Sequence, residues 1–178
     1  MSRNLQRPCP ACESLGARES GDKNGYYFFV CRACRSIFTG RLPEADEHED
    51  YDVYYDESNL TVPEFVVKRI GEIVDGFSPY RSTNRLLDVG FGAGSIMQVA
   101  EERSWEVFGT EISLPAVKHA RSMGRRVHHG TLSSAEYPDG HFDVITASEI
   151  LEHLPNPVVE LKEIHRILRP GGLFWGTT

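Results

Sequence analysis

A glycine-rich turn between an apolar run and a helix-like segment constrains this chain more than any other stretch. The turn lies within LLDVGFGAGS at residues 86–95. A second apolar run ends at Glu111, 21 positions after Gly90. Glycines let a backbone approach a ligand closely, and an acid about 20 residues further on is placed to hold two ribose hydroxyls. The stretch therefore predicts a pocket for an adenosine-containing ligand.

Strand and helix signals alternate around this turn, after a helical pattern that begins at Pro63. The expected strands and the helices between them lie at 85–89, 95–103, 106–110, 114–123, 127–129, 142–146, 157–168 and 173–176. Such alternation predicts an α/β fold with a doubly wound, mostly parallel sheet and right-handed crossovers. Few residues follow the fifth strand to cover the last edge of the sheet. We therefore expect a sheet that is incomplete at its C-terminal side, in a fragment of a longer protein.

The four cysteines form two C-x-x-C pairs with 18 residues between them. They are Cys9, Cys12, Cys31 and Cys34. This spacing is typical of a four-thiolate zinc site, which leaves no open position and is therefore structural. The segment is too short to fold on a hydrophobic core, so metal binding would supply its folding free energy. Two disulfides are the alternative, which the lack of a secretion signal disfavours.

These patterns divide the chain into a zinc ribbon over 1–42, a linker over 43–62 and a cofactor domain over 63–178. Residues 43–60 are rich in Asp and Glu and contain no Lys or Arg, as is typical of a solvated linker. Three tyrosines are unusual in such a linker: Tyr51, Tyr54 and Tyr55. They predict either a lid over the cofactor or a packing contact.

Charge and hydropathy narrow the partners and the location. The 178 residues carry a formal net charge of -7, whereas proteins that bind bulk nucleic acid usually present a basic face. Residues 1–10 lack the apolar stretch of a signal peptide, and no apolar run approaches the roughly 20 residues of a membrane span. We expect a cytoplasmic protein without a nucleic-acid or membrane partner, and leave its oligomeric state open.

The glycine turn and three later segments together resemble the motifs of one known family. LLDVGFGAGS (86–95), GTEIS (109–113), FDVITASEILEHLPNP (142–157) and LRPGG (168–172) resemble motifs of the class I S-adenosylmethionine-dependent methyltransferases. The resemblance covers residues 85–178 and implies a Rossmann-like fold that binds S-adenosyl-L-methionine. It implies that Gly90, Gly92 and Gly94 line the methionine part of the cofactor, that Asp88 lies nearby, and that Glu111 holds the ribose diol.

The same resemblance implies the remaining cofactor contacts. Ile112 is expected to contact adenine, and Ser148 to lie beside the cofactor at the end of the fourth strand. Many family members place an acid after the third strand to meet the adenine amino group. Here that region is Gly130-Thr131-Leu132, so a backbone contact near Leu132 is expected to substitute.

Catalytic candidates follow from the chemistry of methyl transfer. The reaction is an in-line displacement, helped by a general base when the acceptor is a hydroxyl. His153 and Glu149 are the candidates, and the alternative for His153 is a packing role. The run Glu149-x-x-Glu152-His153 also resembles the magnesium-binding run of small-RNA 3′-end methyltransferases, which needs a further histidine. Trp105 and Trp175 are expected in the core.

We therefore expect methyl transfer to oxygen or nitrogen of a small-molecule acceptor. A zinc ribbon ahead of such a domain resembles bacterial methyltransferases of sugar and natural-product pathways, and some ribosomal-RNA methyltransferases also carry one. RNA methylation is the alternative activity, and a non-catalytic cofactor-binding module that recognises its partner through the ribbon is the alternative of another class. A nicotinamide-dependent oxidoreductase fits poorly, because Ser95 takes the place of the last glycine in G-x-G-x-x-G.

Overall fold

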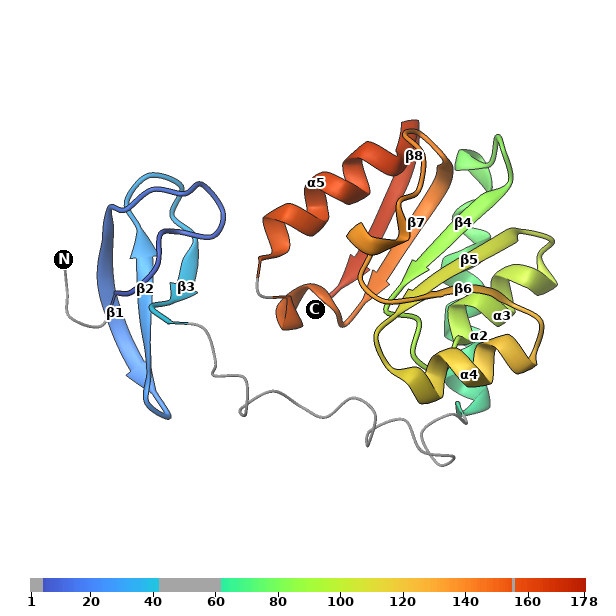
Figure 1. The fold of residues 1–178 in the computed structure, drawn as a ribbon, viewed down its shortest axis with the longest axis horizontal. Coiled ribbons are helices and arrows are strands. Elements are labelled where there is room, and N and C mark those ends of the chain that lie inside the picture. Colours follow the sequence, from blue (N-terminus) through green and yellow to red (C-terminus); the bar gives the residue numbers. More distant parts are fainter. Residues whose placement is uncertain (1–4, 42–61, 155) are drawn as a thin grey trace. The chain divides into compact units, whose positions relative to one another are not determined.

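The computed structural model describes residues 5–41, 62–154 and 156–178. The chain forms two compact units, a small one that contains the cysteines and a larger α/β one (Figure 1). The acidic linker expected over 43–62, with its three tyrosines, lies outside the described residues except for Val62. Within the described ranges, no helix combines the length and the apolar character that a membrane crossing requires.

The small unit is a three-stranded antiparallel sheet in the order β1 (Ala17–Lys23), β2 (Tyr26–Cys31) and β3 (Ile37–Thr39). Its first hairpin turns at Asn24 and Gly25, whose φ angles of 52° and 79° are the two positive values that a type I′ turn needs. Asn-Gly is the residue pair that this turn type prefers. The buried core is small: Phe29 and Phe38, with ring centroids 6.2 Å apart, pack beside two cysteines.

The larger unit contains a five-stranded sheet in the order β6-β5-β4-β7-β8. Every pair of neighbouring strands in it is parallel. The strands are β4 (Arg85–Val89), β5 (Glu106–Glu111), β6 (Arg126–His129), β7 (Phe142–Ser148) and β8 (Leu168–Thr177). The predicted doubly wound α/β sheet is confirmed, with the first strand of the domain in its centre.

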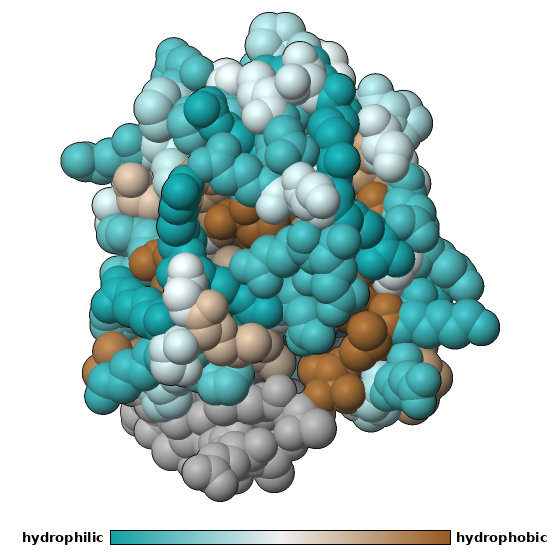
Figure 2. All heavy atoms as spheres, turned by 90° about the vertical axis from the view of Figure 1, so that its right-hand side faces the viewer, coloured by the Kyte–Doolittle hydropathy of each residue, from teal (hydrophilic) through white to brown (hydrophobic). Residues whose placement is uncertain are grey.

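Helices cover both faces of this sheet (Figure 1). One face carries α2 (Glu64–Asp75), α3 (Ser95–Glu102) and α4 (Leu114–Ser122), and the other carries α5 (Pro157–Ile167). Short 3-10 helices lie at Ser78–Tyr80, Ser133–Ala135 and Leu151–His153. The surface facing the viewer in Figure 2 is largely hydrophilic, with hydrophobic side chains in separate patches, as expected for the outer sides of amphipathic helices.

The last strand departs from the prediction. The sequence places a helix stop at Pro170-Gly171-Gly172 before a strand at 173–176, whereas β8 follows α5 directly and begins at Leu168. The register against β7 shifts between Phe142 and Val144. Gly171 takes a left-handed φ of 75°, and a Cβ on Gly172 would lie 2.8 Å from the Asp143 carbonyl oxygen. The Pro-Gly-Gly segment is therefore an irregularity within a strand rather than a loop before one.

Asp143 on β7 anchors the segment that enters the sheet. Its side chain is fully buried, and Oδ2 accepts hydrogen bonds of 2.7 Å from the backbone N–H groups of Ser82 and Asn84. Arg169 donates from Nε to the other carboxylate oxygen at 2.5 Å. Burial alone would raise the pKa of Asp143, but the N–H donors of residues 82–84 and the Arg169 guanidinium outweigh it and lower the pKa to about 2.

We expect Asp143→Asn to reduce the free energy of unfolding by about 2 kcal/mol at pH 7. Because the folded-state pKa lies below the unfolded value of about 3.9, this contribution is present above pH 4 and is lost as pH falls toward 2. Urea unfolding at pH 7 and pH 3 measures both effects. Asp139→Asn is the matched control, since Asp139 pairs with Arg166 at the exposed surface and should change stability little.

Candidate functional site

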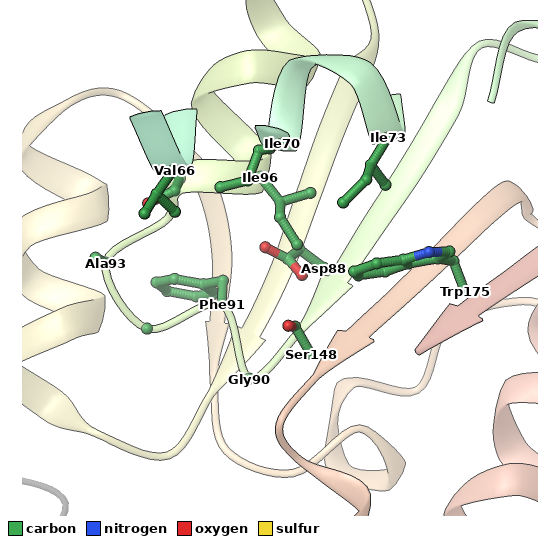
Figure 3. A pocket seen from close by; sticks show the side chains of 12 residues that line it. Val66, Ile70, Ile73, Asp88, Gly90, Phe91, Ala93, Ile96, Ser148 and Trp175 are labelled. Carbon is green, nitrogen blue, oxygen red and sulfur yellow. The ribbon is translucent and has the colours of Figure 1, made fainter. Parts of the chain in front are cut away.

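A pocket of about 360 Å³ opens where β4 and β7 end, beside α2 (Figure 3). Its polar lining includes Asp88, Ser95 and Ser148, together with the backbone at Gly90 and Gly92. The carboxyl ends of parallel strands, near the point where the strand order reverses, are where ligands bind in open α/β sheets. The structure thus brings four of the predicted cofactor-binding residues together at one pocket.

The glycine turn has an alternating left-handed backbone. Gly90, Gly92 and Gly94 have φ angles of 65°, 51° and 73°, which residues with a side chain rarely adopt. The N–H of Gly90 continues the sheet by donating to the Thr110 carbonyl at 2.8 Å. Successive N–H groups in such a backbone can form a concave anion site. In this chain, however, the anion that the Gly92 N–H meets is a side chain of the protein.

That anion is the carboxylate of Glu111, at the end of β5. Its Oε2 accepts from the Gly92 N–H at 3.0 Å, and its Oε1 accepts from the N–H groups of Ile112 and Ser113 at 2.8 and 2.9 Å. The residue is only 5% exposed. Because the Gly92 N–H already donates to the Glu111 carboxylate, it is not free to bind a pyrophosphate. This disfavours the alternative of a dinucleotide-binding protein.

Sequence reasoning missed why two of the glycines are required. A Cβ on Gly90 would lie 2.2 Å from the side chain of Ile150, and a Cβ on Gly94 would lie 2.7 Å from the guanidinium of Arg125. The Arg125 side chain is 3% exposed and pairs with Glu101 at 3.2 Å. The turn is therefore held by packing from two distant segments, in addition to any ligand that it contacts.

Asp88 is a buried acid at the floor of the pocket. It is 2% exposed, and Thr146 Oγ1 donates to its Oδ1 at 2.7 Å. Burial raises the pKa of Asp88 to about 7, helped by the nearby Glu111 charge and opposed by the Thr146 hydrogen bond and the Arg125 charge. A carboxylate in this position favours a cationic group of a bound ligand, because such a group would stabilise its ionised form.

The expected adenine side lies at the ends of β5 and β6. The side chain of Ile112 is 51% exposed, and the His129 Nε2 lies 3.1 Å from the Ile112 carbonyl oxygen. Leu132 is 2% exposed, and its carbonyl already accepts from the Ala135 N–H at 3.1 Å. One lone pair of the Leu132 carbonyl oxygen is therefore already occupied. The expected backbone contact between this region and adenine stays a prediction, and it would use another backbone group near Leu132.

The two catalytic candidates, Glu149 and His153, follow the pocket residue Ser148 in the chain. Among the described residues that line the pocket, β7 contributes Ser148, and neither Glu149 nor His153 is included. Glu149 is exposed and has a left-handed φ of 53°, while its N–H donates to the Thr177 carbonyl at 3.0 Å. Unusual backbone of this kind is often found beside active sites. His153 is exposed at the end of the 3-10 helix Leu151–His153.

The four cysteines of the small unit form one cluster. They are free thiols, and their sulfur atoms all lie within 4.8 Å of one another. Two sulfur pairs are 3.6 Å apart, namely Cys9 with Cys34 and Cys12 with Cys31. A tetrahedral ion with bonds of about 2.3 Å would separate its sulfurs by about 3.8 Å, whereas a disulfide requires about 2.05 Å.

The two turns that carry these cysteines repeat the same backbone pattern. In each, the N–H of the first cysteine donates to the carbonyl five residues later, as Cys9 does to Ser14 and Cys31 to Ser36. In each, the residue four positions after that cysteine is left-handed, with φ of 61° at Glu13 and 69° at Arg35. Two matching knuckles that present two sulfurs each fit a single tetrahedral zinc ion.

Comparison with known proteins assigns the larger unit to a family. The family described as "Methyltransferase domain" matches residues 87–176, and the chain therefore belongs to it. Among curated relatives, the 27-O-demethylrifamycin SV methyltransferase of Amycolatopsis mediterranei is 30% identical over 128 residues, which are 67% of this chain and 47% of that protein. The ubiquinone biosynthesis O-methyltransferase of Idiomarina loihiensis is 32% identical over 101 residues, with shares of 53% and 42%. The chain spans less than half the length of these two relatives.

Solved structures agree on the fold. The [4+2]-cyclase SpnF is 30% identical, with a TM-score of 0.51 over 60% of this chain and 43% of that one. A SAM dependent methyltransferase from Archaeoglobus fulgidus superposes with a TM-score of 0.55 at 24% identity, over 67% of this chain and 54% of that one. Since one of these neighbours is named as a cyclase, the fold alone does not fix the reaction.

Proposed function

We propose that the α/β unit binds S-adenosylmethionine and transfers its methyl group to oxygen or nitrogen of a small-molecule acceptor. The observation that carries this proposal is the joining of the glycine turn to Glu111 beside a pocket with a buried acid at its floor. The relatives are named as a methyltransferase of 27-O-demethylrifamycin SV and as an O-methyltransferase of ubiquinone biosynthesis, which supports a small-molecule acceptor of the natural-product kind. The formal charge of -7 gives no support to the RNA alternative.

In this proposal, Glu111 holds the ribose and Asp88 faces the cationic end of the methionine. A carboxylate has about four lone-pair sites, and three of those of Glu111 already accept N–H groups. The remaining site is on Oε2, so we expect one direct hydrogen bond from the ribose diol rather than the two that the sequence alone predicts. Gly90 and Gly92 would contact the methionine part through their backbone.

The chemistry requires alignment more than bond-making groups from the protein. The cofactor supplies a methyl group on a positively charged sulfur, which is already a good leaving group. The pocket would orient the acceptor opposite that sulfur. Glu149, directly after β7, or His153, at the end of the 3-10 helix Leu151–His153, would take the proton from an acceptor hydroxyl. Ser148 would position the acceptor or cofactor from the pocket side.

We expect Glu111→Ala to weaken S-adenosylmethionine binding by about tenfold to a hundredfold, because it removes a charge-assisted hydrogen bond to the ribose. It should also lower the free energy of unfolding by roughly 1–3 kcal/mol, since three N–H groups lose their acceptor. Calorimetric titration and thermal unfolding measure the two effects. Glu106→Ala, on the opposite end of the same strand, is the matched control and should leave cofactor affinity unchanged. An unaltered affinity in Glu111→Ala would refute the assignment.

We also propose that one zinc ion is held by Cys9, Cys12, Cys31 and Cys34. The sulfur separations and the repeated knuckles support it. Four thiolates leave no open position for a substrate or water, so the ion would stabilise the fold and take no part in methyl transfer.

A further inference from the structure

The pocket has two chemically different sides. One side carries the polar groups, and the other side is an apolar wall (Figure 3). Its side chains come from α2, α3 and β8, together with Phe91 of the glycine turn. The helices contribute Val66, Ile70, Ile73 and Ile96, and β8 contributes Trp175. Among the described lining residues, Asp88 is the one charged side chain. The wall therefore offers contact area and very few hydrogen-bonding groups.

Trp175 is the largest side chain on this wall, and the fold buries it only in part. It is half-buried, with its ring centroid 6.3 Å from that of Phe77, and it borders the pocket. Trp105, by contrast, is 5% exposed, and the Arg81 guanidinium lies 4.1 Å from its ring centroid. The expectation that both tryptophans belong to the core is therefore right for Trp105 and only partly right for Trp175.

The charged end of the cofactor does not account for such a wall. The methionine end carries an ammonium and a carboxylate, which need the charged and polar groups of the opposite side. A sugar acceptor would bury hydroxyl groups against Ile70, Ile73 and Trp175 without partners, and each unpaired group costs roughly 1–3 kcal/mol. A flat, apolar ring would bury its faces there and gain both transfer free energy and ring stacking.

We propose that the acceptor is a hydroxylated or aminated aromatic ring that packs on the wall formed by Trp175 and α2, with its nucleophilic atom turned toward Ser148 and Asp88. This inference rests on the proposed methyl transfer and selects the natural-product class over the sugar class. Trp175 is then a specificity-determining residue on the acceptor side of the pocket, and the cofactor would occupy the polar side of the same pocket.

The test uses two probes that both carry neighbouring hydroxyls on a six-membered ring, 4-methylcatechol and methyl α-D-glucopyranoside. The protein is first saturated with S-adenosylhomocysteine, whose affinity is measured by calorimetry. Probe binding is then followed by the fluorescence of Trp175 in a Trp105→Phe background, since the chain contains two tryptophans. Trp175→Ala and Trp175→Phe are compared by calorimetry.

We expect 4-methylcatechol to bind and to change Trp175 emission, and methyl α-D-glucopyranoside to have no effect. Trp175→Ala should weaken 4-methylcatechol binding by about tenfold, Trp175→Phe should largely restore it, and S-adenosylhomocysteine affinity should change by less than about threefold in both. Val66→Asp offers a second wall variant, because Val66 is not among the side chains that pack on the buried core. It should weaken 4-methylcatechol binding even if Trp175→Ala does not fold.

Two results would overturn this inference while leaving the proposed function intact. One is normal S-adenosylhomocysteine binding with 4-methylcatechol affinity unchanged in Trp175→Ala and Val66→Asp. The other is tighter binding of the sugar than of the catechol. Failure of S-adenosylhomocysteine itself to bind would overturn both the proposed function and the acceptor site that depends on it.

Discussion

Removal of zinc is expected to unfold the ribbon, residues 5–41, while the α/β unit keeps its fold and its cofactor affinity. The buried core of the ribbon consists of Phe29 and Phe38 beside Cys9 and Cys31, which is too little to offset the conformational entropy of about 40 residues. A structural zinc in such small modules contributes roughly 10–16 kcal/mol, so its loss removes the whole stability of the unit. Two-dimensional NMR spectra with and without a chelator measure the effect on each unit.

Elemental analysis should find one zinc per chain. Cys31→Ser should lose the metal and unfold the ribbon, whereas Ser20→Ala, at an exposed position on β1, should do neither. A protein without zinc whose mass corresponds to two disulfides would contradict the assignment. So would a ribbon that keeps its dispersed NMR signals after chelation.

Asp88→Asn is expected to stabilise the cofactor-free protein at pH 8 and to impair cofactor binding. The folded-state pKa of Asp88 is raised to about 7, against an unfolded value of about 3.9. The folded state therefore holds this proton more tightly, and stability falls as pH rises from about 4 to about 7. Above pH 7 the cost of the buried charge is fully present, at up to about 4 kcal/mol.

An asparagine removes that cost while its Oδ1 can still accept the hydrogen bond from Thr146. The stabilisation in Asp88→Asn should be largest at pH 8 and should fade toward pH 4, as denaturant unfolding over a pH series would measure. Binding of S-adenosylmethionine should weaken by about tenfold to a hundredfold, since its cationic end loses a charged partner. Asp143→Asn is the contrasting variant, because the pKa of Asp143 is lowered and its loss should destabilise. If Asp88→Asn has a lower free energy of unfolding than the unsubstituted protein at pH 8, the buried Asp88 charge does not destabilise the fold.

Local signals were enough to predict most of the fold. The first strand of the domain is Arg85–Val89 as expected, and α4 begins after Ser113, whose side chain accepts from the Ala116 N–H as an N-cap. Hydrophobic periodicity, caps and Asn-Gly turns depend on neighbours within a few residues, so they can be read along the chain. The start of β8 at Leu168 could not be predicted in this way. Pairing with β7 extends the strand through Pro170, where the sequence predicts a loop between helix and strand.

Some features of the candidate site could likewise be predicted from the sequence, and others depend on tertiary contacts. Spacing along the chain is the signal that identifies the groups that carry chemistry, namely the paired cysteines, the glycine turn, and the acids at Asp88 and Glu111. How these groups are used depends on contacts between distant segments, which form only when the chain folds. The fold gives Glu111 three backbone N–H donors. It also places the Ile150 side chain against Gly90 and the Arg125 side chain against Gly94. It also formed the apolar wall, since Val66 and Trp175 are more than 100 residues apart. Periodicity marks which side chains are buried, but folding decides which of them meet.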